Sequence, residues 1–256
     1  RDNFGKPYPQ DMLYTVALQR AEDLRRAGRK VSESDIASFI KAGMTGTTDK
    51  ARADRYQKLL DKIAALPKFG NDLDEIDTLA REVAYTYTRP LQQYRNPRGG
   101  RYQAGLYPVS ANVPLGQQTG ATPDGRLAYT PVADGVSPVS GRDLKGPTAA
   151  ANSVAKLDHG IASNGTLYNM KFHPSALAGQ QGLVNFASFI RTYFDHKGMH
   201  VQFNVVSRET LLDAQKHPEN YKALVVRVAG YSALFTTLSR SLQDDIINRT
   251  EQTGNY

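Results

Sequence analysis

Apolar residues recur at helical spacing through the first third of the chain. The clearest stretch is residues 9–27, where the helical pattern stops at Gly28, a common helix end. Three further stretches are predicted as helices: residues 35–41, the charged run that ends at Ala65, and residues 72–88. Pro67 and Pro90 follow the last two of these predicted helices, and a proline disfavours helical backbone in the residue that precedes it. This pattern predicts that residues 1–95 form a helical scaffold segment.

From Asn96 onward the pattern changes to continuous or alternating apolar runs, separated by glycine and proline. Such runs predict strands; we expect them at residues 106–114, 166–172, 199–206 and 224–228. Helical patterns lie between these runs, at residues 149–157, 183–194 and 209–216. Ser207 precedes the last of them as a candidate N-cap. Strands that alternate with helices predict an α/β fold with crossover connections.

The charge balance is basic, with 32 Lys and Arg against 25 Asp and Glu and a formal net charge of +7 over 256 residues. Such an excess could attract nucleic acid or anionic substrates. The basic residues are scattered, however, and the one dense group, from Arg20 to Lys30, fits the solvated face and last turn of a helix. We therefore expect no nucleic-acid partner. No stretch has the length and apolarity of a membrane span and no secretory signal is recognisable, so we expect a cytoplasmic protein without a membrane partner.

The sequence contains no cysteine and five histidines. The lack of cysteine excludes disulfides, thiolate metal sites and iron–sulfur ligation within this chain. The intervals between the histidines match no metal motif such as His-Glu-x-x-His, and we expect no carboxylate ligand pair near any of them. We therefore expect no metal site. His173 and His200 lie in strand-like segments, where we predict structural hydrogen bonds.

The most informative segment reads RVAGYSA, from Arg227 to Ala233, directly after an apolar run. The common interpretation of such a glycine is a tight turn or a bulge at the end of a strand. A chemical interpretation is also open. A radical at a peptide α-carbon is stabilised when it is planar and shared with the flanking amides, and a Cβ would crowd that geometry. Only glycine lacks a Cβ, so Gly230 is the residue that could store such a radical.

This segment resembles the radical-bearing loop of the glycyl radical enzymes, a family in which one backbone glycine stores an unpaired electron. Other segments resemble the same family, in the same order, between residues 69 and 252. They are FGND at 69–72, NPRGG at 96–100, TGATPDGR at 119–126, NGTL at 164–167, KFHPS at 171–175, HVQFNVV at 200–206 and LQDDII at 242–247. Several motifs in register are far more specific than the glycine loop alone.

The resemblance implies a particular α/β architecture. Residues 96–256 would form the second half of a ten-stranded barrel with surrounding helices, and would include the C-terminal glycine radical domain. The Gly230 loop would be threaded into the middle of the barrel. Because water or oxygen would quench an α-carbon radical, we expect the loop in a closed interior, with Val226, Val228 and Phe235 as its apolar surroundings.

The resemblance also implies chemistry that needs a second stretch of polypeptide. In the family, the glycyl radical takes a hydrogen atom from a cysteine, and the thiyl radical attacks the substrate. That cysteine and a glutamate lie N-terminal to the matched segments. Because this chain starts at Arg1 and has no cysteine, we expect it to be the C-terminal part of a larger enzyme or one chain of a split enzyme, inactive alone.

Other partners follow from the resemblance. They are a radical S-adenosylmethionine activating enzyme, which removes a hydrogen atom from Gly230, a small-molecule substrate, and a second copy in a homodimer. The protein-derived glycyl radical at Gly230 would be the only cofactor. The resemblance implies the cytoplasm of an anaerobic organism, with a bacterial microcompartment as one location.

The segments GLYPVS at 105–110 and KLDH at 156–159 resemble the eliminase branch of the family. This branch includes glycerol and diol dehydratases, choline trimethylamine-lyase, hydroxyproline dehydratase and isethionate sulfite-lyase. We therefore predict a dehydratase-type lyase that acts on a small hydroxylated substrate. A C–S or C–N lyase of the isethionate or choline type and a formate acetyltransferase-like enzyme stay open. So do a spare-part subunit that replaces the lost radical domain of a damaged partner, and a purely structural module.

The strand predicted at residues 106–114 would face the barrel interior. Residues two apart share one face of a strand, so Tyr107, Val109 and Ala111 are predicted to line the substrate pocket. A register slip of one residue would exchange this set for its neighbours, and a proline at position 108 weakens the strand pattern. Arg101 could bind an anionic group of the substrate because its guanidinium suits a carboxylate or a sulfonate, although a surface arginine in a glycine-rich loop is the commoner interpretation.

Overall fold

The computed structural model describes residues 50–254, which belong to two compact units. The first unit comprises Arg1–Leu66 and Thr119–Thr130, and the second comprises Pro67–Gln118 and Pro131–Tyr256. The helices predicted at residues 9–27 and 35–41, and the basic group from Arg20 to Lys30, lie outside the described residues.

The described part of the first unit consists of helix α3 and a loop closed by a buried arginine. Helix α3 spans Lys50–Ala65, so the predicted stop before Pro67 is confirmed. In the loop, the Arg126 guanidinium donates to the carbonyl oxygens of Leu127 and Thr130, at 3.1 and 2.7 Å, and also to that of Gly120. The loop at residues 119–130 is therefore packed by internal hydrogen bonds.

The second unit contains most of the predicted helices. They are α4 (Asp74–Leu91), α6 (Pro147–Ala155), α7 (Gly179–Asp195) and α8 (Arg208–Lys216). A further helix, α9 (Arg240–Asn248), contains the LQDDII segment. The Ser207 cap is confirmed, because its hydroxyl accepts from the amide of Thr210 at 3.1 Å at the start of α8. The predicted end of α4 before Pro90 is wrong, since Pro90 lies inside its last turn. A proline there removes one main-chain donor and leaves the earlier helical bonds intact.

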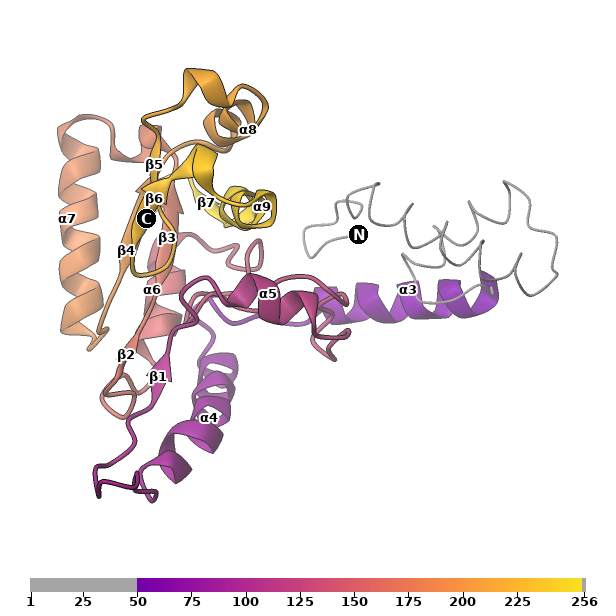
Figure 1. Cartoon of the computed structure of the whole chain (residues 1–256), viewed down its shortest axis with the longest axis vertical. Coiled ribbons are helices and arrows are strands. Elements are labelled where there is room, and N and C mark those ends of the chain that lie inside the picture. The colour runs from indigo at the N-terminus through magenta and orange to yellow at the C-terminus, as the bar shows by residue number, and fades with distance from the viewer. Residues whose placement is uncertain (1–49, 255–256) are drawn as a thin grey trace. The chain divides into compact units, whose positions relative to one another are not determined.

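Three small sheets organise the second unit. Strand β3 (Asn169–Phe172) lies between β4 (Gln202–Val205) and β7 (Glu251–Gln252), parallel to both. Helix α7 forms the predicted crossover between β3 and β4, and Figure 1 shows α7 on one side of this sheet and α8 and α9 on the other. Strands β1 (Gly105–Leu106) and β2 (Gly165–Thr166) form a second parallel pair. The strand predicted at 166–172 is thus split between two sheets.

The third sheet is a hairpin of β5 (Val225–Arg227) and β6 (Ser232–Leu234), which confirms the strand predicted at 224–228. Short 3-10 helices, η1 (Pro174–Leu177), η2 (Pro218–Asn220) and η3 (Phe235–Thr237), complete the connections. The described strands are seven in number and form no closed barrel. The α/β class is confirmed, whereas the ten strands and the division at residue 95 stay predictions.

The predicted strand at 106–114 is wrong beyond its first residue. After β1 the chain makes a turn, in which the amide of Ala111 donates to the Pro108 carbonyl at 2.9 Å, and then enters the short helix α5 (Asn112–Gln117). Pro108 has no amide hydrogen to give to a ladder. Val109 has φ +57°, a left-handed conformation that is rare for a β-branched residue and incompatible with a strand.

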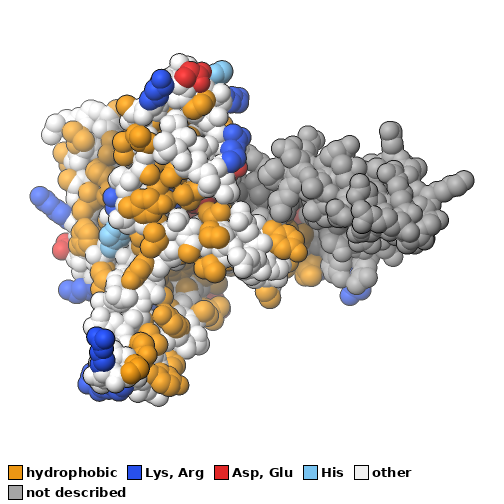
Figure 2. Space-filling view, in the orientation of Figure 1, with side chains coloured by type: hydrophobic (Ala, Val, Ile, Leu, Met, Phe, Trp, Pro, Cys, Tyr) orange, Lys and Arg blue, Asp and Glu red, His pale blue; other side chains and the backbone are white. Residues whose placement is uncertain are grey.

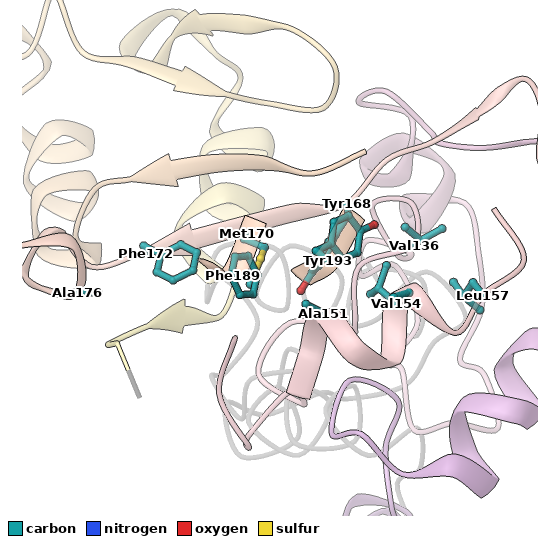
Figure 3. Packing of buried hydrophobic residues seen from close by; sticks show 11 residues of the cluster. Val136, Ala151, Val154, Leu157, Tyr168, Met170, Phe172, Ala176, Phe189 and Tyr193 are labelled. Carbon is teal, nitrogen blue, oxygen red and sulfur yellow. The ribbon is translucent and has the colours of Figure 1, made fainter. Parts of the chain in front are cut away.

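Two hydrophobic cores support these elements. The first joins β3 with α6 and α7, and Figure 3 shows Met170 and Phe172 of β3 beside Phe189, with Tyr168 against Tyr193. The second joins the hairpin to α8 and α9, and its fully buried members include Leu211 and Ile246. Val226, Val228 and Phe235, the predicted apolar neighbours of Gly230, are at most 1% exposed and lie in this second core.

The second unit also exposes apolar side chains. Figure 2 shows them spread over the face that carries the hairpin, and the exposed set includes Val205, Val225, Tyr231 and Leu234. Among residues 50–254, no helix has both the length and the apolarity of a membrane span.

Candidate functional site

Gly230 lies at the tip of the β5–β6 hairpin. The amide of Val228 donates to the carbonyl of Tyr231 at 2.9 Å and closes the tip. Gly230 has φ +81°, a left-handed backbone that favours glycine. Space is not the constraint, because a Cβ built on Gly230 would meet only Leu167 Cδ1, at 3.5 Å. The turn interpretation of this glycine is therefore confirmed.

The expected closed interior holds for the base of the hairpin and not for its tip. Val228 and Ala229 are at most 1% exposed, but Gly230 itself is exposed. The expectation is therefore wrong for Gly230 within the described residues. The apolar side chains of Val226 and Val228, before the tip, pack into the α8–α9 core, whereas Gly230 at the tip is not part of that core.

Side-chain amides hold the hairpin to strand β4. Gln202 and Asn204 stand two residues apart on β4 and therefore share a face. The Asn204 side chain accepts from the amide of Arg227 and donates to the carbonyl of Arg227, both at 2.8 Å. No backbone ladder joins the described strands β4 and β5. Asn204 therefore replaces a ladder with two side-chain bonds.

Gln202 contacts the candidate radical residue directly. Its Oε1 accepts from the amide of Gly230 at 3.1 Å and from Arg227 Nη2 at 2.8 Å. Its Nε2 donates to Asn169 Oδ1, and Asn169 Nδ2 donates to Asp134 Oδ2 at 2.7 Å. Gln202 and Asn169 are only 6% and 8% exposed, so the backbone of Gly230 rests on a buried polar chain.

A buried arginine closes the floor of the site. Arg249 Nε lies 3.5 Å from Asp134, and Arg249 Nη2 donates to Asp245 at 3.1 Å. Arg249 Nη1 also donates to the carbonyl of Arg227, at 3.3 Å. Burial raises the pKa of Asp245, and the charge of Arg249 opposes that rise. The floor of the site thus consists of the carboxylates of Asp134 and Asp245 and the guanidinium of Arg249, which bonds to the hairpin at Arg227.

Tyr107, Val109 and Ala111 were predicted to share one face of a strand, but none of them lies in a strand. Tyr107 is exposed, its ring lies against Gly105, and its hydroxyl accepts from Asn164 Nδ2 at 2.9 Å. Val109 lies in the turn with its side chain exposed, and Ala111 is half-buried just before α5. Arg101 is exposed in a loop bridge opposite Arg95. The shared face of Tyr107, Val109 and Ala111 is therefore a wrong prediction, and substrate contact by these three residues and Arg101 stays a prediction.

The sequence interpretation missed the polar chain of Asp134, Asn169, Gln202 and Asn204. A signal existed, because polar residues alternate with apolar ones in strands otherwise interpreted as buried. Buried amides need partners, but periodicity alone does not tell which partners they have.

The histidines make the predicted structural bonds. His173 Nδ1 pairs with the Ser175 hydroxyl at 2.6 Å, and His200 Nδ1 accepts from the amide of Tyr168 at 3.4 Å. Burial first, and then the charge of Arg227, lower the pKa of His200.

The statement that no carboxylate pair stands near a histidine is wrong in three dimensions. The ligand atoms of His173, Glu209 and Glu251 lie within 4.8 Å of one another. Glu251 already accepts from the amide of Arg208 at 2.7 Å and lies 3.7 Å from the Lys171 ammonium. These two partners satisfy much of its charge without a metal.

A cavity of about 530 Å³ among the described residues contains no residue of the hairpin in its lining. Asp72, Asp74 and His196 contribute to its wall, together with Lys156. The Lys156 ammonium donates to Asp72, Asp74 and Asp77 at 2.6, 2.7 and 3.0 Å. This ion cluster joins α4 to α6, which is a structural role for the aspartate of the FGND motif.

Two family models match the chain. The model described as "Glycine radical" matches residues 132–236, which include Gly230 and its hairpin, and the model described as "Pyruvate formate lyase-like" matches residues 33–116. The chain belongs to the glycyl radical enzyme family. The match supports a protein-derived glycyl radical as its redox group.

Similar proteins of this family include dehydratases. A structure titled for 1,2-propanediol dehydration in Roseburia inulinivorans is 64% identical, with a TM-score of 0.80 over 98% of this chain and 30% of that one. The B12-independent glycerol dehydratase from Clostridium butyricum is 57% identical, with a TM-score of 0.76 over 81% of this chain and 27% of that one. The probable dehydratase YbiW of Escherichia coli K12 is 54% identical over 86% of this chain and 27% of its own length. The chain thus spans less than a third of each of these relatives.

Proposed function

We propose that the chain is the C-terminal part of a glycyl radical dehydratase and that Gly230 stores its radical. The observation that supports this most is the setting of Gly230, a glycine with φ +81° at a hairpin tip whose amide is held by a buried glutamine. The radical would be formed by loss of one Cα hydrogen atom. The absence of a Cβ allows the resulting carbon to become planar between its two amides.

The stored radical acts on substrate through a sulfur that another part of the enzyme supplies. A cysteine S–H bond breaks, a Gly230 Cα–H bond forms, and the thiyl radical then removes a hydrogen atom beside a hydroxyl of the substrate. The sequence has no cysteine, so the step needs the cysteine-bearing polypeptide. The exposure of Gly230 leaves its Cα open to an approaching thiol.

The substrate is proposed to be a small diol or triol, by similarity to proteins named for propanediol and glycerol dehydration. In this proposal the residues at 105–116 form one wall of the pocket. Tyr107 and Val109 expose their side chains, and Ala111 stands at the start of α5. Arg101 would contact an anionic group where the substrate has one. The left-handed Val109 is the kind of backbone strain that clusters at ligand sites.

The three sheets of the second unit are proposed to be part of one half of the family's ten-stranded barrel. The cysteine-bearing half would then cover Gly230 and the exposed apolar side chains of the hairpin. A radical S-adenosylmethionine enzyme would activate Gly230 and a second copy would complete a homodimer, in the cytoplasm or a microcompartment of an anaerobe. The match of residues 33–116 to the lyase-like model favours this reading over a small spare-part subunit.

Electron spin resonance after anaerobic activation tests the proposal. The protein is combined with its cysteine-bearing part and with a radical S-adenosylmethionine activating enzyme. We expect a doublet, from the one α-hydrogen left on Gly230, and none in Gly230→Ala. Because alanine at φ +81° costs about 1–2 kcal/mol, the matched control is Gly179→Ala, which has φ +70° and open space around its Cβ. A doublet of normal size in Gly230→Ala would refute the assignment.

A further inference from the structure

Two buried side-chain amides, Asn169 and Gln202, connect Asp134 to the backbone amide of Gly230. Asn169 donates to Asp134, Gln202 donates to Asn169, and Gly230 donates to Gln202. The three side chains are 12%, 8% and 6% exposed, in order from Asp134 to Gln202. Asp134 stands in the loop before α6, and the two amides stand on the neighbouring strands β3 and β4.

The two ends fix the direction of every hydrogen bond in this chain. A carboxylate only accepts and a backbone amide only donates. Asn169 must therefore turn its NH₂ group to Asp134 and its oxygen to Gln202. Gln202 must in turn direct its oxygen to Gly230. The orientation of both amide groups follows from this network, which is the basis on which such groups are assigned.

A chain of this kind carries the effect of the carboxylate to its far end. Hydrogen bonds in series polarise one another in a buried, low-dielectric setting. The negative charge of Asp134 makes the Asn169 oxygen a better acceptor, and this in turn strengthens the Gln202 oxygen as an acceptor. Arg227 Nη2 donates to the same Gln202 oxygen at 2.8 Å and holds it in place.

The Gln202 oxygen would affect a radical at Gly230 through the hydrogen bond that it accepts from the Gly230 amide. When the α-carbon loses a hydrogen atom and becomes planar, the nitrogen shares its lone pair with the half-filled orbital, and its N–H becomes a stronger donor. The bond to Gln202 is then stronger in the radical than in the ordinary peptide. Only such a difference between two states can shift the equilibrium between them.

We propose that Gln202 is a positioning residue that stabilises the stored radical through the Gly230 amide, with Asp134 acting on it through Asn169. This inference rests on the proposed function of Gly230. Neither Gln202 nor Asp134 touches the substrate or the reacting carbon in this assignment. Their effect is on how far the unpaired spin spreads onto the nitrogen of Gly230.

Two matched pairs of variants test the inference. Gln202→Met keeps the length of the side chain and removes the acceptor, and Gln243→Met removes a buried amide that donates to Phe235 and Leu238 instead. Asp134→Asn removes the charge at the remote end, and Asp77→Asn removes a buried carboxylate that pairs with Lys156 in the ion cluster between α4 and α6. All four are activated anaerobically in the complete enzyme, after thermal unfolding has shown that each is folded.

The readout is the splitting of the spin-resonance doublet, with the number of spins per chain beside it. Without the acceptor, more spin stays on the α-carbon, so Gln202→Met is expected to widen the splitting. It should also hold about two- to tenfold fewer spins, the equivalent of one neutral hydrogen bond. Asp134→Asn should shift the splitting in the same direction by less. The two control variants should keep the wild-type splitting.

The outcomes separate the two proposals. A wild-type doublet with unchanged splitting and yield in Gln202→Met overturns the role of Gln202. If Gln202→Met does not fold, Asp134→Asn decides, because an unchanged splitting there removes the link from Asp134. Absence of any doublet in the activated wild-type protein counts against the radical at Gly230 and not against the polar chain alone.

Discussion

Asp143 is a buried carboxyl near the floor of the candidate site, and its protonation makes stability depend on pH. Burial raises the pKa of Asp143 to about 6, against hydrogen bonds from Thr250 and Gln252 that lower it. The folded state therefore holds this proton more tightly than the unfolded state, whose pKa is near 3.8. As pH rises from about 4 to about 6, this group should reduce the free energy of unfolding by about 2 kcal/mol.

Replacement of Asp143 by asparagine tests that dependence. Urea unfolding of Asp143→Asn should lack this loss between pH 4 and pH 6, because asparagine does not titrate while its side chain still fits between Thr250 and Gln252. Asp158→Asn, at an exposed position, should follow the wild type. An identical pH profile in wild type and Asp143→Asn would contradict the effect of burial.

Single residues also show where sequence reasoning stops. The turn at Gly230 was predictable, because glycine after a β-branched run is a common turn signal. The left-handed φ of Val109 was not, since no propensity favours it and only the surrounding fold enforces it. The hydrogen bond between Gln202 and Gly230 joins residues 28 apart in the sequence. Periodicity indicates burial, but it cannot pair two such groups.

At the scale of elements, the hairpin depends on Asn204 for its attachment to β4. Asn204→Leu would leave the amide of Arg227 without this partner and its carbonyl with only the bond from Arg249, at a cost of about 1–3 kcal/mol. We expect faster hydrogen exchange in a peptide covering residues 224–235, with the rest of the unit little changed. The control is Ser207→Ala, which loses a helix cap worth about 1 kcal/mol at α8. Equal exchange of the hairpin in both variants would argue against an attachment through Asn204.

Elements were predictable in proportion to their length and periodicity. Helix α7 appears close to its predicted range because a long amphipathic pattern, here 17 residues, leaves few alternatives. Helices α6 and α8, nine residues each, also lie close to their predicted ranges. The segment at 106–114 failed because a short apolar run containing Pro108 is compatible with a strand, a turn or a helix start. The order of β3, β4 and β7 required the fold itself, since β7 is two residues long and pairs with a strand 80 residues earlier.

At the scale of the whole molecule, the exposure of Gly230 has a consequence for oxygen sensitivity. The tip is exposed, and the apolar side chains of Val225, Tyr231 and Leu234 are exposed beside it. A complete enzyme would cover this face, because an α-carbon radical open to oxygen is lost and because apolar surface of this kind favours burial against a partner. The chain spans 27–30% of the length of the relatives described above, so most of the polypeptide in those relatives lies outside the matched part and is long enough to cover this face.

Exposure of the activated protein to air should therefore cut the backbone beside Gly230, and the cysteine-bearing part should slow the cut. Oxygen adds to the α-carbon radical, and the adduct decays with cleavage of the main chain at that residue. Intact mass measurement would follow the two fragments over time, with and without the cysteine-bearing part present. Gly230→Ala should stay whole under both conditions, and Gly179→Ala should be cut as the wild type is. Equal cleavage rates with and without the cysteine-bearing part would mean that this part does not cover the hairpin tip.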